Sequence, residues 1–79
     1  MKTKKNIPIR IDLRAVGRRI REIRGFDLTQ AQFGKIFGVH QATLSKYEQG
    51  HSAPTLEFLA QLKAYSNRSI DWIVTGEDR

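Results

Sequence analysis

Five side chains with the spacing of one helix face have the chemistry needed to contact the edges of DNA bases. They stand at i, i+1, i+4, i+5 and i+8, and they are Gln41, Ala42, Ser45, Lys46 and Gln49. A Gln amide can form two hydrogen bonds with adenine, a Lys ammonium can reach the acceptors of guanine, and an Ala methyl can meet the methyl of thymine. Any exposed helix face is polar, so polarity alone does not indicate DNA binding. The further evidence must come from the elements that position this face.

A turn of three residues, Gly38-Val39-His40, precedes this face. Two short helices joined by so few residues must cross steeply, as in a helix-turn-helix. Gly34 lies inside the preceding helix, where glycine costs up to about 1 kcal/mol, and we expect the close approach of helix 41–49 to compensate. Leu44 should fill the angle between the two helices. On the side opposite the candidate contact face we expect Leu44, Tyr47 and Glu48.

Apolar spacing and capping residues predict five short helices around one core. Asp12 caps the first helix, and Thr29 with Gln32 forms a capping box at the second. The others are expected at about residues 41–49, 55–65 and 70–75, the last capped by Ser69. The expected inward side chains are Leu13, Val16, Ile20, Ile23, Phe33, Ile36, Phe37, Leu56, Leu59, Leu62, Ile70, Ile73 and Val74.

The arginines of the first helix differ in their angle to its apolar stripe. Arg14, Arg18 and Arg21 share a stripe well away from it, and we interpret them as a solvated face in preference to a binding surface. Arg24 falls only about 60° from the centre of the apolar stripe. It should therefore lie at the edge of the core and require an acidic partner.

The positive charge is concentrated at the beginning of the chain. The net charge is +6 over 79 residues, which indicates an anionic partner, most often a nucleic acid. Residues 1–24 carry nine Lys or Arg against Asp12 and Glu22, or +7; residues 25–50 sum to zero and residues 51–79 to −1. Residues 1–11 form a basic arm that is either a frayed terminus, a segment that follows DNA, or one that pairs with another chain.

Several function classes are excluded. The sequence has no cysteine and no apolar run of about 18 residues, so we expect no thiol chemistry, no membrane span and a cytoplasmic location. His40 and His51 lie in different segments without an acidic cluster. We therefore expect no metal site, no cofactor and no catalysis.

Several blocks of residues, in order and spacing, match a known family. The blocks include VGRRIREIR at residues 16–24, LSKYEQG at residues 44–50 and SIDWIVTG at residues 69–76, together with residues 28–30, 33–34, 38–39 and 54. Residues 16–76 resemble the phage-repressor and Cro type of helix-turn-helix domain, the XRE family. The resemblance implies a lambda-repressor-like domain over residues 12–79 and a sequence-specific transcriptional regulator, a repressor, with recognition helix 41–49 in the major groove of DNA.

The resemblance also implies roles for individual residues. Arg24 would pair with Glu48. Gln30 would bind a phosphate and brace Gln41. The base-reading set would be Gln41, Ala42, Ser45 and Lys46, and the residues near phosphates would be Gln30, Thr43, Gln49 and His51.

The sequence departs from the family pattern at several places. The connection between the first two helices is one residue shorter than the commonest pattern, and Asp27 replaces the usual glycine before Leu28. His40 stands at the N-cap of the recognition helix, where Ser or Thr is usual, so the cap is weaker or the imidazole serves instead. The loop after this helix lacks the lysines often found there. We therefore predict that part of the phosphate affinity has moved to the arm residues Lys2, Lys4 and Lys5.

Two kinds of partner follow from these observations. A repressor of this type would act as a homodimer on a pseudo-palindromic double-stranded operator, and Trp72 either caps the core or lies in the dimer contact. The alternative function is an antitoxin that binds a protein toxin and regulates its own operon. Such a protein needs a segment that wraps the toxin, and with the sequence ending soon after Gly76 only the arm is expected to serve.

Overall fold

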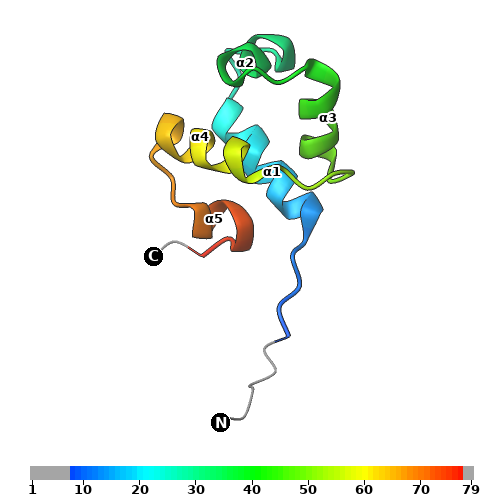
Figure 1. Ribbon diagram of the computed structural model, residues 1–79, viewed down its shortest axis with the longest axis vertical. Coiled ribbons are helices and arrows are strands. Elements are labelled where there is room, and N and C mark those ends of the chain that lie inside the picture. The colour runs from blue at the N-terminus through cyan, green and yellow to red at the C-terminus, as the bar shows by residue number, and fades with distance from the viewer. Residues whose placement is uncertain (1–7, 78–79) are drawn as a thin grey trace.

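Five helices make up the regular structure of the part of the chain that the computed structural model describes, residues 8–77 (Figure 1). The helices are α1 (Leu13–Arg24), α2 (Gln30–Phe37), α3 (Gln41–Gln49), α4 (Leu56–Ser66) and α5 (Ile70–Thr75). No strand occurs among these residues. The all-α fold with five helices is therefore confirmed.

Local side-chain caps explain where most of the helices begin. The Asp12 carboxylate accepts hydrogen bonds from the backbone N–H groups of Arg14 and Ala15, at 3.1 and 3.2 Å. At α2 both halves of the capping box are present, with Gln32 N–H bound to Thr29 Oγ1 and Thr29 N–H bound to Gln32 Oε1. The exception is α3, because the imidazole of His40 makes no capping hydrogen bond. Of the two alternatives for this N-cap, a weaker cap or a cap by the imidazole, the structure has the weaker cap.

The turn between α2 and α3 explains two of the glycines. Gly38 has φ 69° and ψ 32°, a left-handed conformation that side chains with a Cβ rarely adopt. The N–H of Val39 then donates to the carbonyl of Gly34, 2.9 Å away, which closes the end of α2. A Cβ on Gly34 would collide with the carbonyl oxygen of Val39. The close approach expected from α3 therefore comes from the turn residue just before it.

The core lies where α1 meets the other helices, with α1 packed against both α3 and α5. Aromatic side chains from α2, α3 and α4 meet in tilted and edge-on pairs, with ring centroids 4.9 Å apart for Phe33 and Phe37 and 5.4 Å for Phe37 and Phe58. Such pairs add to the stabilisation from buried apolar area. The buried cluster consists of Val16, Ile20, Phe33, Phe37, Leu44, Tyr47, Phe58, Leu59, Leu62 and Ile73.

The prediction that three side chains are buried in the core is wrong. Ile36 is 49% exposed, Leu56 is 83% exposed and Ile70 is 37% exposed. Leu56 and Ile70 are each the first residue of a helix, where the side chain leans away from the body of the helix and off the core. Phe58 takes the inward position in α4. For Ile36, the neighbouring Phe33 and Phe37 already fill the space beneath α2.

Residues 8–12 precede α1 without regular structure and lead away from the helices in Figure 1. Ile9 and Ile11 are exposed there, so the alternating pattern of this segment does not correspond to a strand packed on the helices. The arm lysines Lys2, Lys4 and Lys5 lie outside the described residues.

Gly34→Ala should destabilise the protein by about 1–3 kcal/mol, because the added methyl has no space beside the Val39 carbonyl. The measurement is urea unfolding followed by circular dichroism. Lys35→Ala, at the next and exposed position, is the control and should change the free energy of unfolding by less than about 0.5 kcal/mol. A Gly34→Ala variant as stable as the wild type would contradict this account of the turn.

Candidate nucleic-acid interface

The helix α3 has one face in the core and one face in solvent. Leu44 and Tyr47 are buried, and only 4% of the Glu48 side chain is exposed. Among the predicted base-reading residues, Gln41, Ala42 and Lys46 are exposed and Ser45 is half-buried beside them. The structure therefore places these four side chains on one outward face.

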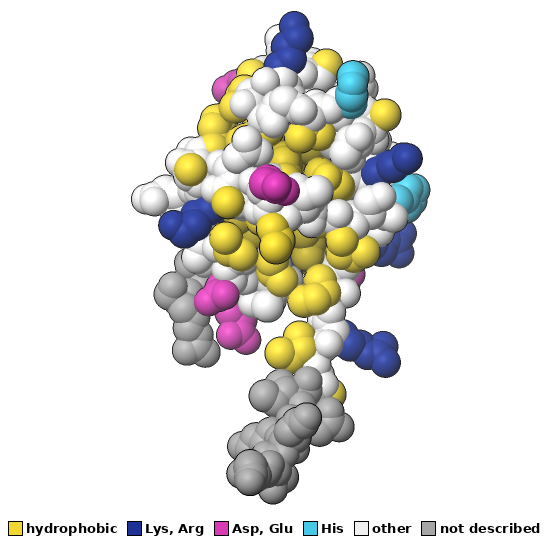
Figure 2. Space-filling model, in the orientation of Figure 1, with side chains coloured by type: hydrophobic (Ala, Val, Ile, Leu, Met, Phe, Trp, Pro, Cys, Tyr) yellow, Lys and Arg dark blue, Asp and Glu magenta, His cyan; other side chains and the backbone are white. Residues whose placement is uncertain are grey.

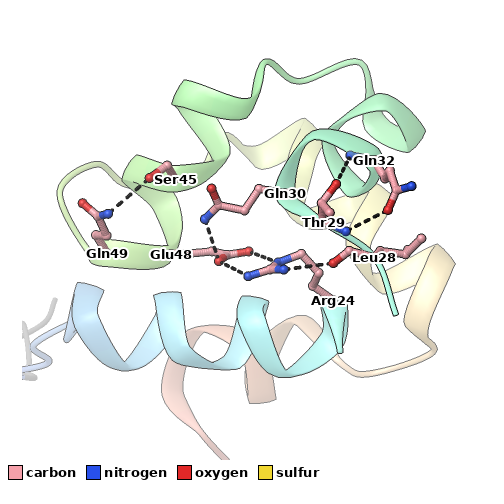
Figure 3. A network of polar contacts seen from close by, with 8 residues as sticks. All are labelled: Arg24, Leu28, Thr29, Gln30, Gln32, Ser45, Glu48 and Gln49. Carbon is pink, nitrogen blue, oxygen red and sulfur yellow. Dashed lines mark hydrogen bonds and ion pairs between the residues drawn. The ribbon is translucent and has the colours of Figure 1, made fainter. Parts of the chain in front are cut away.

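An ion pair connects this helix to the end of α1 (Figure 3). Arg24 Nε lies 2.8 Å from Glu48 Oε2, and the Arg24 Nη2 atom lies 2.9 Å from Oε1, so the contact has two parallel hydrogen bonds. Arg24 Nη1 also donates to the carbonyl of Leu28, at 3.0 Å. The pair implied by the resemblance is thus present, and it joins α1, α3 and the start of α2.

Burial and pairing have opposite effects on the Arg24 guanidinium. Its hydrogen bond to Glu48 raises the pKa of Arg24 above the ordinary value, while burial opposes the increase. Only 13% of the Arg24 side chain is exposed. The arginine is therefore charged at any physiological pH, and it neutralises the Glu48 carboxylate.

The side chain of Gln30, the first residue of α2, has a different partner from the expected one. Its amide donates to Glu48 Oε1 over 3.0 Å (Figure 3). Within the described part of the chain Gln30 forms no hydrogen bond with Gln41. The reason is that Glu48 Oε1 can accept a second hydrogen bond besides that from Arg24. Gln30 and Arg24 together hold Glu48 from two helices.

Another contact on α3 was not anticipated from the sequence. The amide of Gln49 donates to Ser45 Oγ over 3.2 Å, within the outward face (Figure 3). The i, i+4 spacing of a Gln and a Ser was the available signal. The contact fixes the Gln49 side chain along the helix toward the base-facing set.

The remaining phosphate candidates lie around the ends and edge of α3. Thr43 is half-buried, and His51 is exposed in the loop that follows α3. Histidine and basic side chains gather along the edge of the molecule at which α3 lies (Figure 2). His51 lines the same surface hollow as Gln49, at the end of α3.

Two arginines outside the predicted site hold the C-terminal helix in place. Arg19 Nη1 donates to the carbonyl of Ile73 over 3.1 Å. The guanidinium carbon of Arg68 lies 3.4 Å from the centre of the Trp72 ring, and Arg68 is 3.9 Å from the Glu22 carboxylate. Trp72 itself is half-buried against the core. No signal in the sequence indicated the contact of Arg19, because its partner Ile73 is 54 positions away. Arg68 and Trp72 are only four positions apart, and this spacing was the available signal for their contact.

Other kinds of site are not apparent in the described part of the chain. Among residues 8–77 no three His, Cys, Asp or Glu side chains come together in a way that could hold a metal ion. None of the helices in this range combines the length and the apolar character that crossing a bilayer requires.

Comparison with known proteins gives three findings. The family model for helix-turn-helix proteins matches residues 18–73. Among solved structures, the chain is similar to the P22 c2 repressor protein in complex with synthetic operator 9T in the presence of Tl+. The two have 32% sequence identity and a TM-score of 0.70, over 78% of this chain and 96% of the repressor chain. No match is found among curated proteins.

Arg24→Met should destabilise the protein by about 3 kcal/mol, because it leaves the Glu48 carboxylate buried without a counter-charge. Chemical denaturation measures the effect. The double variant Arg24→Met/Glu48→Leu should recover most of the loss, since no unpaired charge remains. Arg21→Met, an exposed arginine on the same helix, is the matched control. Equal stability of Arg24→Met and Arg21→Met would show that the pair has no structural role.

Proposed function

Because the chain belongs to the phage-repressor and Cro type of helix-turn-helix proteins, we propose that it is a transcriptional repressor that binds double-stranded DNA with sequence specificity. The single observation that carries the proposal is the outward face of α3. This face is polar, free of acidic side chains and held at a fixed angle by the turn and by the Arg24–Glu48 pair. The similar P22 c2 repressor is itself seen in complex with an operator.

In this proposal α3 enters the major groove and its exposed side chains contact base edges. Gln41, at the beginning of the helix, bonds an adenine, and Lys46 reaches the acceptors of guanine. Ala42 offers its methyl to a thymine. The hydroxyl of Ser45 accepts a hydrogen bond from the Gln49 amide and can still donate its own proton to a base.

The phosphate contacts are proposed around this face. The amide of Gln30 retains a second N–H for a phosphate while the first binds Glu48. Thr43, Gln49 and His51 are the other candidates near α3. Lys2, Lys4 and Lys5 are proposed to add phosphate affinity from the arm, which remains a prediction from the sequence.

We propose that two copies bind one pseudo-palindromic operator. A single α3 of nine residues reads only a few base pairs, and proteins of this type reach specificity by placing two half-sites about one DNA turn apart. The candidate dimer contact is Trp72 with its neighbours on α5. Trp72 is half-buried and Ile70 is exposed, so apolar area is available there for a second copy.

Gln41→Ala and Lys46→Ala should each weaken binding to the preferred duplex by about 1–3 kcal/mol and relax base preference at one position. The experiment selects binding sites from random duplex DNA with each purified variant and then measures Kd. Gln61→Ala and Lys63→Ala, which remove the same groups from the exposed side of α4, are the controls. An equal loss on all sequences would mean that the residue contacts phosphate only. A wild-type protein without any sequence preference would refute the proposed function.

Trp72→Ala should reduce affinity for a duplex with two half-sites while leaving affinity for one half-site nearly unchanged. Loss of the dimer contact removes the cooperative gain, but the base-reading face stays in place. Fluorescence anisotropy on the two duplexes measures the ratio, and sedimentation reports the oligomeric state. The assignment of Trp72 to the dimer contact would be wrong if this ratio were the same for variant and wild type.

A further inference from the structure

An open notch lies between the N-terminal half of α1 and the end of α3. Its volume is about 350 Å³, and it is lined by Arg14, Arg18, Glu48, Gln49 and His51. This volume is sufficient for a phosphodiester group with its hydration. The notch brings together side chains from α1, α3 and the loop after α3.

The two walls of the notch are held together by backbone contact. A Cβ on Gly50 would lie 2.8 Å from the Cα of Arg14, and a Cβ on Gly17 would lie 2.5 Å from the carbonyl oxygen of Tyr47. Both distances are shorter than atoms allow, so α1 and the end of α3 are in direct contact there. The position of Arg14 and Arg18 relative to α3 is therefore fixed by packing.

The lining of the notch has an excess of positive charge. Within residues 8–77 the guanidinium groups of Arg14 and Arg18 have no hydrogen bond or ion pair, whereas Arg19 and Arg24 on the same helix are both bound to other helices. The one acid in the lining, Glu48, is already neutralised by Arg24 and bound by Gln30. Two unpaired positive charges thus face an open space without a free carboxylate.

In the proposed complex, with α3 lying across the major groove, the notch is beside a DNA backbone. The nine residues of α3 span about 14 Å at a rise of about 1.5 Å per residue, slightly more than the width of the major groove, about 12 Å. When the beginning of α3 contacts bases, its end therefore reaches the edge of the groove. Gln49 belongs both to the outward face of α3 and to the notch, so the two surfaces are continuous.

We propose that this notch binds one phosphate of the DNA backbone that flanks each half-site. Arg18 and Arg14 supply the charge, and Gln49 and His51 complete the set of donors. The proposal rests on the proposed DNA-binding function. It revises the interpretation of Arg14 and Arg18 as a solvated face, because α1 carries them to the end of the recognition helix.

The first test is the salt dependence of binding to the duplex enriched from a random library. Each phosphate contact contributes about 0.9 to the slope of log Kd against log salt. Arg18→Gln should lower the slope by nearly one contact for each half-site that is bound, and should weaken binding about five- to tenfold per half-site at 0.1 M salt, with Arg14→Gln in the same direction. Base preference in a repeated selection should not change. Lys63→Gln, which removes one charge from α4, is the control and should leave the slope unchanged.

The second test uses duplexes in which one phosphate at a time is replaced by an uncharged methylphosphonate. At one flanking position the replacement should weaken binding of the wild type and have no effect on Arg18→Gln, because the two changes remove the same contact. Circular dichroism melting of Arg18→Gln should match the wild type, since this side chain has no internal partner.

The outcomes separate the notch from the proposed function. If the wild type prefers its enriched duplex but Arg18→Gln keeps the full slope and every methylphosphonate effect, the notch is not a phosphate site. The same conclusion follows if Lys63→Gln lowers the slope equally, because net charge alone then explains the loss. If the wild type binds no duplex, the DNA-binding function itself fails.

Discussion

Direct contact between α1 and the backbone of α3 is the constraint on which the interface depends. Only Leu44 and Tyr47 anchor α3 in the core by apolar burial, which leaves the orientation of a nine-residue helix loosely determined. The absence of a side chain at Gly17 allows α1 to touch the carbonyl groups at the end of α3. The Arg24–Glu48 pair adds a directional contact farther along α1. Together these contacts orient the outward face before any DNA is bound.

The arginines of α1 divide into two groups according to what lies beside them. Arg19 and Arg24 bind groups of other helices and stabilise the fold. Arg14 and Arg18 have no such partner and line the notch at the end of α3. The same helix thus contains arginines that stabilise the fold and arginines that we propose to bind phosphate. In the proposed complex, α3 can then remain nearly neutral and discriminate between base pairs by its amides, its hydroxyl and its shape.

Much of the fold and part of the site could be predicted from the sequence. Helix ends were predictable because caps such as Asp12, Thr29 and Ser69 act within three residues of their own position. The two faces of α3 were predictable because helical periodicity decides them. The exposure of Ile36 and Leu56 and the binding of Gln30 to Glu48 were not predictable. The exposure of Ile36 and the contact of Gln30 depend on how neighbouring helices are placed, and the exposure of Leu56 depends on the residue at which α4 begins.

By itself the sequence determined where helices begin and end, which turn joins α2 to α3 and which side chains share the outward face. These properties follow from hydrogen bonds and spacings along a few consecutive residues. Only the tertiary structure decided that Gln30 binds Glu48, that Arg19 binds the carbonyl of Ile73, and that Arg14 and Arg18 flank the end of α3. The hydrogen bonds of Gln30 and of Arg24 to Glu48 join residues 18 and 24 positions apart. They depend on the packing angle between helices, which no local pattern encodes.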